Sequence, residues 1–171
     1  MSPASSSISF QQEIILASPS ASHPDIVIKP LSERDFAAWE AQWLGYLGFY
    51  EAEVPAATRL VTWQRLLDPS EPMFGALATI DGKAVGVVHW IFHRSCWTVE
   101  HSCYLQDLYV APEQRGTGLG RLLIEHVYAA AKAAGSTRVH WLTRETNSTA
   151  MQLYDRIADR SGFVQYRKQL A

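Results

Sequence analysis

Three alternate glycines and two arginines lie close together at residues 115–121. The segment reads Arg115-Gly116-Thr117-Gly118-Leu119-Gly120-Arg121, and apolar residues at helical spacing follow it. Glycines have no Cβ, so the backbone can turn several N–H groups toward one point, and the start of the following helix adds free N–H donors and a partial positive charge. Such a turn binds phosphate. The two arginines add charge, and the segment therefore predicts a phosphate-binding turn.

The spacing of these residues indicates which type of phosphate-binding loop is present. A Walker loop needs Gly-Lys-Ser/Thr, which is absent, and a dinucleotide fingerprint needs a glycine where Arg121 stands. The pattern that fits is Arg-x-x-Gly-x-Gly, formed by Arg115, Gly118 and Gly120. It resembles the pyrophosphate loop of the GNAT superfamily of acetyl-CoA-dependent N-acetyltransferases. A glycine-rich turn without a ligand is the alternative.

A second segment also resembles this family. It has the pattern Asn-x-x-Ala-x-x-x-Tyr, from Asn147 to Tyr154, followed by Gly162-Phe163. Asn147 and Tyr154 are seven residues apart, which is two helical turns or about 10 Å along one face. The family usually has Gly-Phe four residues after the tyrosine, and here the interval is eight, so we expect a longer helix. This variant resembles the histone/polyamine acetyltransferase branch.

The resemblance implies a set of contacts with acetyl-CoA. It implies that Asn147 contacts the pantetheine or pyrophosphate arm, that Tyr154 lies near the thioester sulfur, and that a backbone N–H of residues 108–110 stabilises the oxyanion. The cofactor-binding residues implied in this way are Leu108, Tyr109, Val110, Arg115, Gly116, Thr117, Gly118, Leu119, Gly120, Arg121, Asn147 and Tyr154.

Acetylation of an amine requires a base for the amine proton and an acid for the thiolate. Tyr154 is the predicted acid, because the pKa of a phenol, about 10, is close to that of a thiol. Related sequences often carry Glu-Asp at the position of Gln106-Asp107, and a glutamine cannot act as a base. We therefore assign the base to Asp107, with a structural carboxylate as the alternative. Other candidates are a water chain, Glu100, Glu145 and the histidines His89, His93 and His101.

Aromatic residues and carboxylates near the end of the first predicted helix suit a cationic acceptor. Tyr46, Tyr50 and Glu51 are the predicted substrate-binding residues, because aromatic faces and negative charge attract an ammonium group. Packing of these aromatics against a sheet is the alternative.

The elements that position these residues follow from periodicity and turn signals. We expect strands at 25–29, 74–80, 84–92, 104–110, 138–143 and 162–166, and helices at 33–50, 56–67, 118–134 and 147–159. Ser32 is the predicted cap of the first helix, with Asp35 as an acidic residue in its first turn. The order β-α-α-β-β-β-α-β-α-β predicts an α/β (α+β) protein with a mixed central sheet and helices on both faces. This order resembles the GNAT fold over about residues 25–169.

The amino-acid composition excludes several classes of protein function and location. The 171 residues carry a net charge of −2, so no basic surplus indicates a nucleic-acid partner, and no run approaches the roughly 20 apolar residues of a membrane helix. Two cysteines are too few for a disulfide framework or a metal site and favour a reduced, cytoplasmic protein. Residues 1–24, rich in Ser, Ala and Pro, predict a flexible arm, and 25–171 a single domain.

These observations predict an enzyme that moves an acetyl group directly from acetyl-CoA to a primary amine. The acceptor is a polyamine-like small molecule, another amine such as an aminoglycoside, or a protein lysine or N-terminus. GNAT relatives often form dimers, so the resemblance implies a homodimer. The alternative is a non-catalytic sensor or docking module that binds acyl-CoA, a reading favoured by Gln106 alone.

Overall fold

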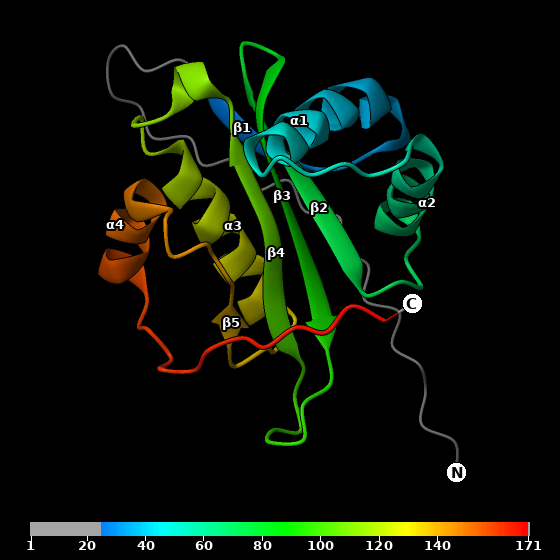
Figure 1. Cartoon of the computed structure of the whole chain (residues 1–171). Helices are drawn as coiled ribbons and strands as arrows, with labels where there is room; N and C mark the ends of the chain where they lie inside the picture. The colour runs from blue at the N-terminus through cyan, green and yellow to red at the C-terminus, as the bar shows by residue number, and fades with distance from the viewer. Residues whose placement is uncertain (1–24, 171) are drawn as a thin grey trace. The chain divides into compact units, whose positions relative to one another are not determined.

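A five-stranded sheet forms the centre of the first part of the chain (Figure 1). The computed structural model describes residues 25–170, so the predicted arm at 1–24 lies outside the described residues. The chain divides into one unit that ends at Trp141 and another that begins at Leu142. In the first unit the strands are β1 (Ile26–Pro30), β2 (Met73–Ile80), β3 (Lys83–His93), β4 (Ser102–Val110) and β5 (Val139–His140).

The sheet is mixed. Neighbouring strands from β1 to β4 are antiparallel, and β5 runs parallel to β4. The helices of the first unit are α1 (Phe36–Phe49), α2 (Ala56–Leu67) and α3 (Leu119–Ala133), with short 3-10 turns η1 (Glu33–Asp35) and η2 (Pro112–Gln114). The second unit contains α4 (Ser148–Ile157).

Helices cover both faces of this sheet, as predicted. Successive side chains of a strand point to opposite faces. His89 of β3 contacts Trp39 and Trp43 of α1, whereas the next residue, Trp90, packs edge-on against His126 of α3. Helices α1 and α3 therefore lie on opposite faces of the sheet (Figure 1).

The core beneath α1 and α2 is built from aromatic and aliphatic side chains. Trp39 is completely buried, and its ring lies 5.0 Å from that of Trp63 of α2. The other buried members of the cluster are Trp43, Leu47, Leu66, Leu77 and Val87. Burying such side chains stabilises a fold by about 1.5–3 kcal/mol each, and here it fixes α1 against β3 and β4.

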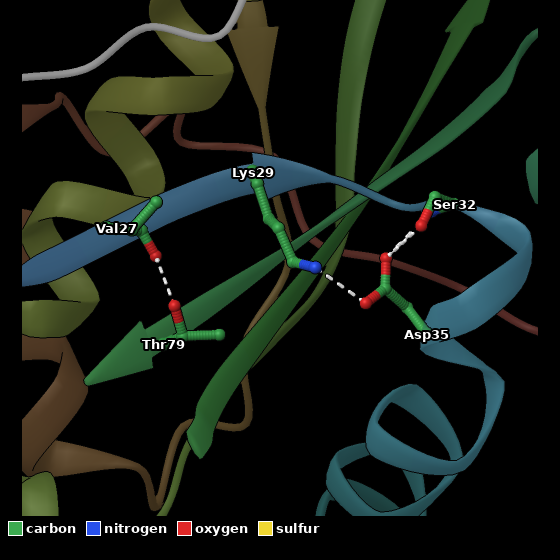
Figure 2. A network of polar contacts seen from close by, with 5 residues as sticks. All are labelled: Val27, Lys29, Ser32, Asp35 and Thr79. Atoms are coloured by element: carbon green, nitrogen blue, oxygen red, sulfur yellow. Dashed lines mark hydrogen bonds and ion pairs between the residues drawn. The ribbon is translucent and has the colours of Figure 1, made fainter. Parts of the chain in front are cut away.

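A polar network holds the start of α1 (Figure 2). The carboxylate of Asp35 accepts hydrogen bonds from the backbone N–H and the hydroxyl of Ser32, at 3.0 and 2.6 Å, and pairs with Lys29 Nζ at 2.7 Å. Burial alone would raise the pKa of Asp35, but the hydrogen bonds from Lys29 and Ser32 outweigh it and lower the pKa. The Lys29–Asp35 pair therefore joins β1 to the first helical turn, which Ser32 caps as predicted.

A β-bulge interrupts β4 at Gln106. His89 pairs with Asp107, but the next residue of β3, Trp90, pairs with Leu105, so Gln106 is the extra residue. In a regular strand Leu105 and Asp107 would face the same side. The bulge instead turns Leu105 toward the face of Trp90 and Asp107 toward the face of His89, beneath α1.

The structure confirms the predicted fold class and the predicted element order as far as α4. The predicted strand at 138–143 is reduced to Val139–His140. The predicted strand at 162–166 is wrong, because residues 158–170 contain no helix or strand. Phe163, Val164 and Tyr166 favour strands, but all three are exposed, and a strand needs a neighbouring strand to bond its N–H and C=O groups. Within the described residues no helix is both long and apolar enough to cross a bilayer.

Candidate active site

The glycine-rich turn joins the end of β4 to the start of α3. Gly116 and Gly118 have left-handed backbones, with φ of 78° and 89°, which residues with a Cβ rarely adopt. A Cβ built on either glycine would meet no protein atom within 4 Å. The turn thus has open space on its outer side, as a bound phosphate would require.

The first turn of α3 presents backbone donors at this turn. Gly118 is the N-cap and has no side chain to bond the free N–H groups of Leu119, Gly120 and Arg121. The 15-residue helix adds the positive end of its dipole. Arg121 is exposed and pairs with Glu125 at 2.7 Å, one helical turn further along. These donors together suit a doubly charged diphosphate.

Arg115 contacts residues on the other side of the turn. Its Nε donates to the carbonyl of Val110 at 3.1 Å. Its guanidinium lies over the rings of Phe49 and Tyr109, with 5.2 and 5.9 Å to the ring centroids. Arg115 therefore connects the glycine turn to the end of α1, and Thr117 closes the turn by donating to the Gln114 carbonyl at 2.8 Å.

One edge of β4 is open beside the turn. Among the described residues, β5 pairs with β4 only at Cys103 and Tyr104. The segment 105–110 contains the predicted cofactor contacts Leu108, Tyr109 and Val110, and within residues 25–170 it has no strand partner on that side. Alternate peptide groups of this segment are thus available to bond an extended ligand.

On the α1 face of β4, Asp107 lies in a cluster of polar and aromatic side chains. Its Oδ2 lies 3.1 Å from His89 Nδ1, and only 6% of the residue is exposed. Tyr46 of α1 lies near enough to the same carboxylate for Asp107 to affect the pKa of its hydroxyl. Tyr104, three residues earlier on β4, is near enough for the charge of Asp107 to affect it.

The two tyrosines stay protonated in this setting. Burial and the charge of Asp107 raise the pKa of Tyr46 and that of Tyr104. Both hydroxyls therefore remain donors near neutral pH, and the negative charge of the cluster resides on Asp107.

Two of the three predicted acceptor residues belong to this cluster. Tyr46 stacks on Trp43 with centroids 4.9 Å apart, and the ring of Tyr50 lies 4.8 Å from that of Tyr46. Glu51 is exposed in the turn after α1, where its φ is 52°. The structure therefore brings Tyr46 near Asp107, packs Tyr50 on Tyr46, and leaves Glu51 at the surface.

In the second unit, α4 contains the other predicted motif. Asn147 is the N-cap of α4, and its Nδ2 donates to Thr143 Oγ1 at 3.0 Å. Tyr154 lies within the same helix. The seven-residue spacing thus falls on a helical segment, as predicted.

The remaining candidates lie outside the Asp107 cluster. His93, Glu100, His101 and Glu145 are exposed. Cys96 is an exposed thiol, and Cys103 is buried on β4, where burial raises its pKa to about 12. Within residues 25–170, no group of three His, Cys, Asp or Glu side chains is arranged to hold a metal ion.

The sequence did not reveal two members of the site, Trp39 and Tyr104. Trp39 Nε1 donates to His89 Nε2 at 2.8 Å, across 50 residues of sequence. The available signal was His89 itself, which stands in the apolar run Val87-Val88-His89-Trp90-Ile91. A buried histidine needs hydrogen-bond partners. Its position in an apolar run could therefore have indicated a buried polar network around it.

Comparison with known proteins identifies the family. Residues 34–158 match the Acetyltransferase (GNAT) family. The chain is 37% identical over 145 residues to a D-amino-acid N-acetyltransferase of Saccharomyces cerevisiae, which covers 84% of this chain and 90% of the relative. It is 36% identical over 70 residues to a thialysine N-epsilon-acetyltransferase of Bos taurus, covering 41% of each chain.

A solved structure shows the same fold. An aminoglycoside N-acetyltransferase in complex with CoA superimposes with a TM-score of 0.76 and 14% identity, covering 90% of this chain and 100% of that one. The resemblance predicted from the glycine turn and from the Asn147–Tyr154 motif is confirmed by the family match. The chain belongs to the Acetyltransferase (GNAT) family and is an N-acetyltransferase.

Proposed function

We propose that this protein transfers the acetyl group of acetyl-CoA to the primary amine of a small molecule of the amino-acid or polyamine class. One observation carries the proposal: Asp107 lies on the strand that leads into the glycine turn, three residues before the strand ends at Val110, which is roughly 10 Å of strand. A diphosphate at the turn and an amine at Asp107 would then lie at the two ends of a short stretch of β4.

The turn fits the diphosphate of acetyl-CoA. The open space beside Gly116 and Gly118 and the uncapped start of α3 meet the steric and electrostatic needs of this group. The open edge of β4 offers peptide groups to the pantetheine arm, and an N–H of residues 108–110 would stabilise the oxyanion. Acetyl-CoA, when bound, supplies an electrophilic thioester carbonyl.

We also propose roles for two residues of the second unit. We assign Asn147 to the pantetheine or pyrophosphate arm and Tyr154 to the thioester sulfur, as the family motif implies. Residues 25–171 would then work as a single catalytic domain.

The acceptor amine must lose a proton before it attacks. A lysine-like amine has a pKa near 10.4, so freeing its lone pair at pH 7 costs on the order of 4–5 kcal/mol. We assign the acceptance of this proton to Asp107. Because Tyr46 is more exposed than Asp107 and lies near it, the amine would meet the Tyr46 hydroxyl and the carboxylate together. The tyrosine rings would enclose the cationic group before it is deprotonated.

Small acceptors are favoured over proteins by one relative. The yeast relative is named for D-amino acids, and it matches most of this chain. Purified protein should therefore release free coenzyme thiol from acetyl-CoA with D-amino acids or polyamines and not with a lysine-containing peptide. Tight acetyl-CoA binding with no turnover on any amine would instead support the acyl-CoA sensor.

The role of Tyr154 can be tested on its own. The change Tyr154→Phe should lower kcat at least about tenfold, since the thiolate would leave without its proton donor. The affinity for acetyl-CoA, measured by calorimetry, should change little. Tyr166→Phe, which removes the same hydroxyl from an exposed tyrosine, is the control. An unchanged kcat under conditions where chemistry limits the rate would remove Tyr154 as the acid.

We further propose a cytoplasmic homodimer. The exposed apolar residues Phe163, Val164, Tyr166 and Leu170 support association through the C-terminal segment. Light scattering on the full chain and on a chain ending at residue 160 tests the oligomeric state.

A further inference from the structure

Three buried side chains from three elements form a continuous hydrogen-bonded chain. Trp39 of α1 donates through Nε1 to His89 Nε2 at 2.8 Å, and His89 Nδ1 lies 3.1 Å from Asp107 Oδ2. Exposed fractions are 0% for Trp39, 4% for His89 and 6% for Asp107. Water therefore has little access to any of these bonds, and the proton positions are set by the side chains themselves.

The indole fixes the tautomer of His89. An indole N–H can only donate, so Nε2 of His89 must present its lone pair to Trp39. The ring proton then resides on Nδ1 and is donated to Asp107, which accepts it as a carboxylate. An imidazolium would place two N–H groups against each other at Nε2. Trp39 thus favours the neutral, Nδ1-protonated ring.

Packing holds the ring in this orientation. Trp43 meets the imidazole edge-on, with centroids 5.0 Å apart. On the neighbouring strand β2, Gly75 leaves room for the ring, since a Cβ there would lie 3.2 Å from His89 Cδ2 and 2.5 Å from Leu31 Cδ1. His89 therefore has little freedom to turn away from Asp107.

The groups that face Asp107 come from α1, β3 and β4. They are Tyr46 of α1, the neutral His89 of β3 and Tyr104 of β4. None of these three groups carries a positive charge, so none of them neutralises the carboxylate. The negative charge remains available to a cationic amine, whereas an imidazolium at position 89 would cancel it.

We propose that His89 is a positioning residue that Trp39 keeps neutral, so that its Nδ1–H orients the ionised Asp107 toward the acceptor amine. This inference rests on the proposed function. In the step concerned, an N–H bond of the amine breaks and an O–H bond forms on Asp107. His89 retains its Nδ1 proton throughout.

Nitrogen NMR of the histidine rings tests the tautomer without any reaction. In the wild-type protein at pH 7, the His89 ring should carry its proton on Nδ1 and present a bare Nε2 to Trp39. In Trp39→Phe, which removes the donor to Nε2, the ring should lose its preference for the Nδ1–H tautomer. A wild-type ring protonated on Nε2, or charged at pH 7, would overturn the inference.

Kinetics of paired variants test the consequence for the reaction. The side-chain amide of His89→Asn can place an N–H near the position of Nδ1, whereas His89→Leu cannot. We expect kcat of His89→Leu to fall by about 10- to 100-fold, as for loss of a hydrogen bond to a charged group, and His89→Asn to recover most of it. The KM for acetyl-CoA should change little in both. His126→Asn, a histidine on the α3 face, is the control and should retain wild-type kcat.

The outcomes separate this inference from the proposed function. A wild-type protein that acetylates no amine would overturn the proposed function, and this inference with it. Equal activities of the Leu and Asn variants in an active enzyme would overturn the positioning role alone. If His89→Leu does not fold, Trp39→Phe decides: a lower kcat with an unchanged KM for acetyl-CoA supports the role, and an unchanged kcat rejects it.

Discussion

Replacing Asp107 with asparagine is expected to lower kcat by at least about 100-fold, the usual contribution of a general base. The amide oxygen of asparagine can still accept the hydrogen bond from His89, so the fold and the acetyl-CoA affinity should be preserved. What the variant loses is the ability to take a proton. Steady-state release of coenzyme thiol gives kcat, and calorimetry gives the affinity.

A second buried carboxylate provides the control. Asp35 is as buried as Asp107, with 8% exposure against 6%, and also accepts several hydrogen bonds. Asp35→Asn should cost about 1–2 kcal/mol of unfolding free energy, since Lys29 is partly exposed and its charge is screened. Its kcat should match the wild type. If Asp107→Asn keeps most of its activity, the base lies elsewhere, and Glu100 and Glu145 become the next residues to test.

Replacing Gly118 with valine is expected to weaken acetyl-CoA binding by at least about 100-fold, equivalent to nearly 3 kcal/mol. Valine would place a branched side chain in the open space that the diphosphate needs. It would also strain a backbone with φ of 89°, at a cost of about 1–3 kcal/mol. Calorimetry on the folded variant measures the affinity, and thermal unfolding measures the strain.

Gly82 separates these two effects. It has φ of 77° in the β2–β3 turn, and a Cβ there would also meet nothing within 4 Å. Gly82→Val should therefore lose similar stability while it binds acetyl-CoA normally. A folded Gly118→Val protein with wild-type affinity would show that the diphosphate binds elsewhere.

The glycine turn and α3 could be predicted because their signals are local. Alternate glycines and a helical apolar face occur within 20 residues, and neither depends on a distant partner. Gly116 and Gly118 adopt the left-handed backbone that such a turn requires. The same reasoning located α1 and its tyrosines.

The arrangement around Asp107 could not be predicted, because it depends on pairing between strands. Alternation along β4 places Leu105 and Asp107 on one face, and only the bulge at Gln106 separates them. The bond from Trp39 to His89 joins residues 50 positions apart and has no local signal. The strand predicted at 162–166 fails for the related reason that composition does not supply a neighbouring strand.

The positions of the two cysteines determine how the reaction can be followed. Chromogenic disulfide reagents react with thiolates, so exposed Cys96 would add one background equivalent per chain, whereas Cys103, with a pKa near 12, would stay silent. Cys96→Ser would remove this background reaction, so the folded protein itself would not react with the reagent. In that variant, any colour that develops without substrate would come from the reagent reacting with Cys103. Because Cys103 is buried on β4, the rate of this reaction would measure how often the sheet opens locally.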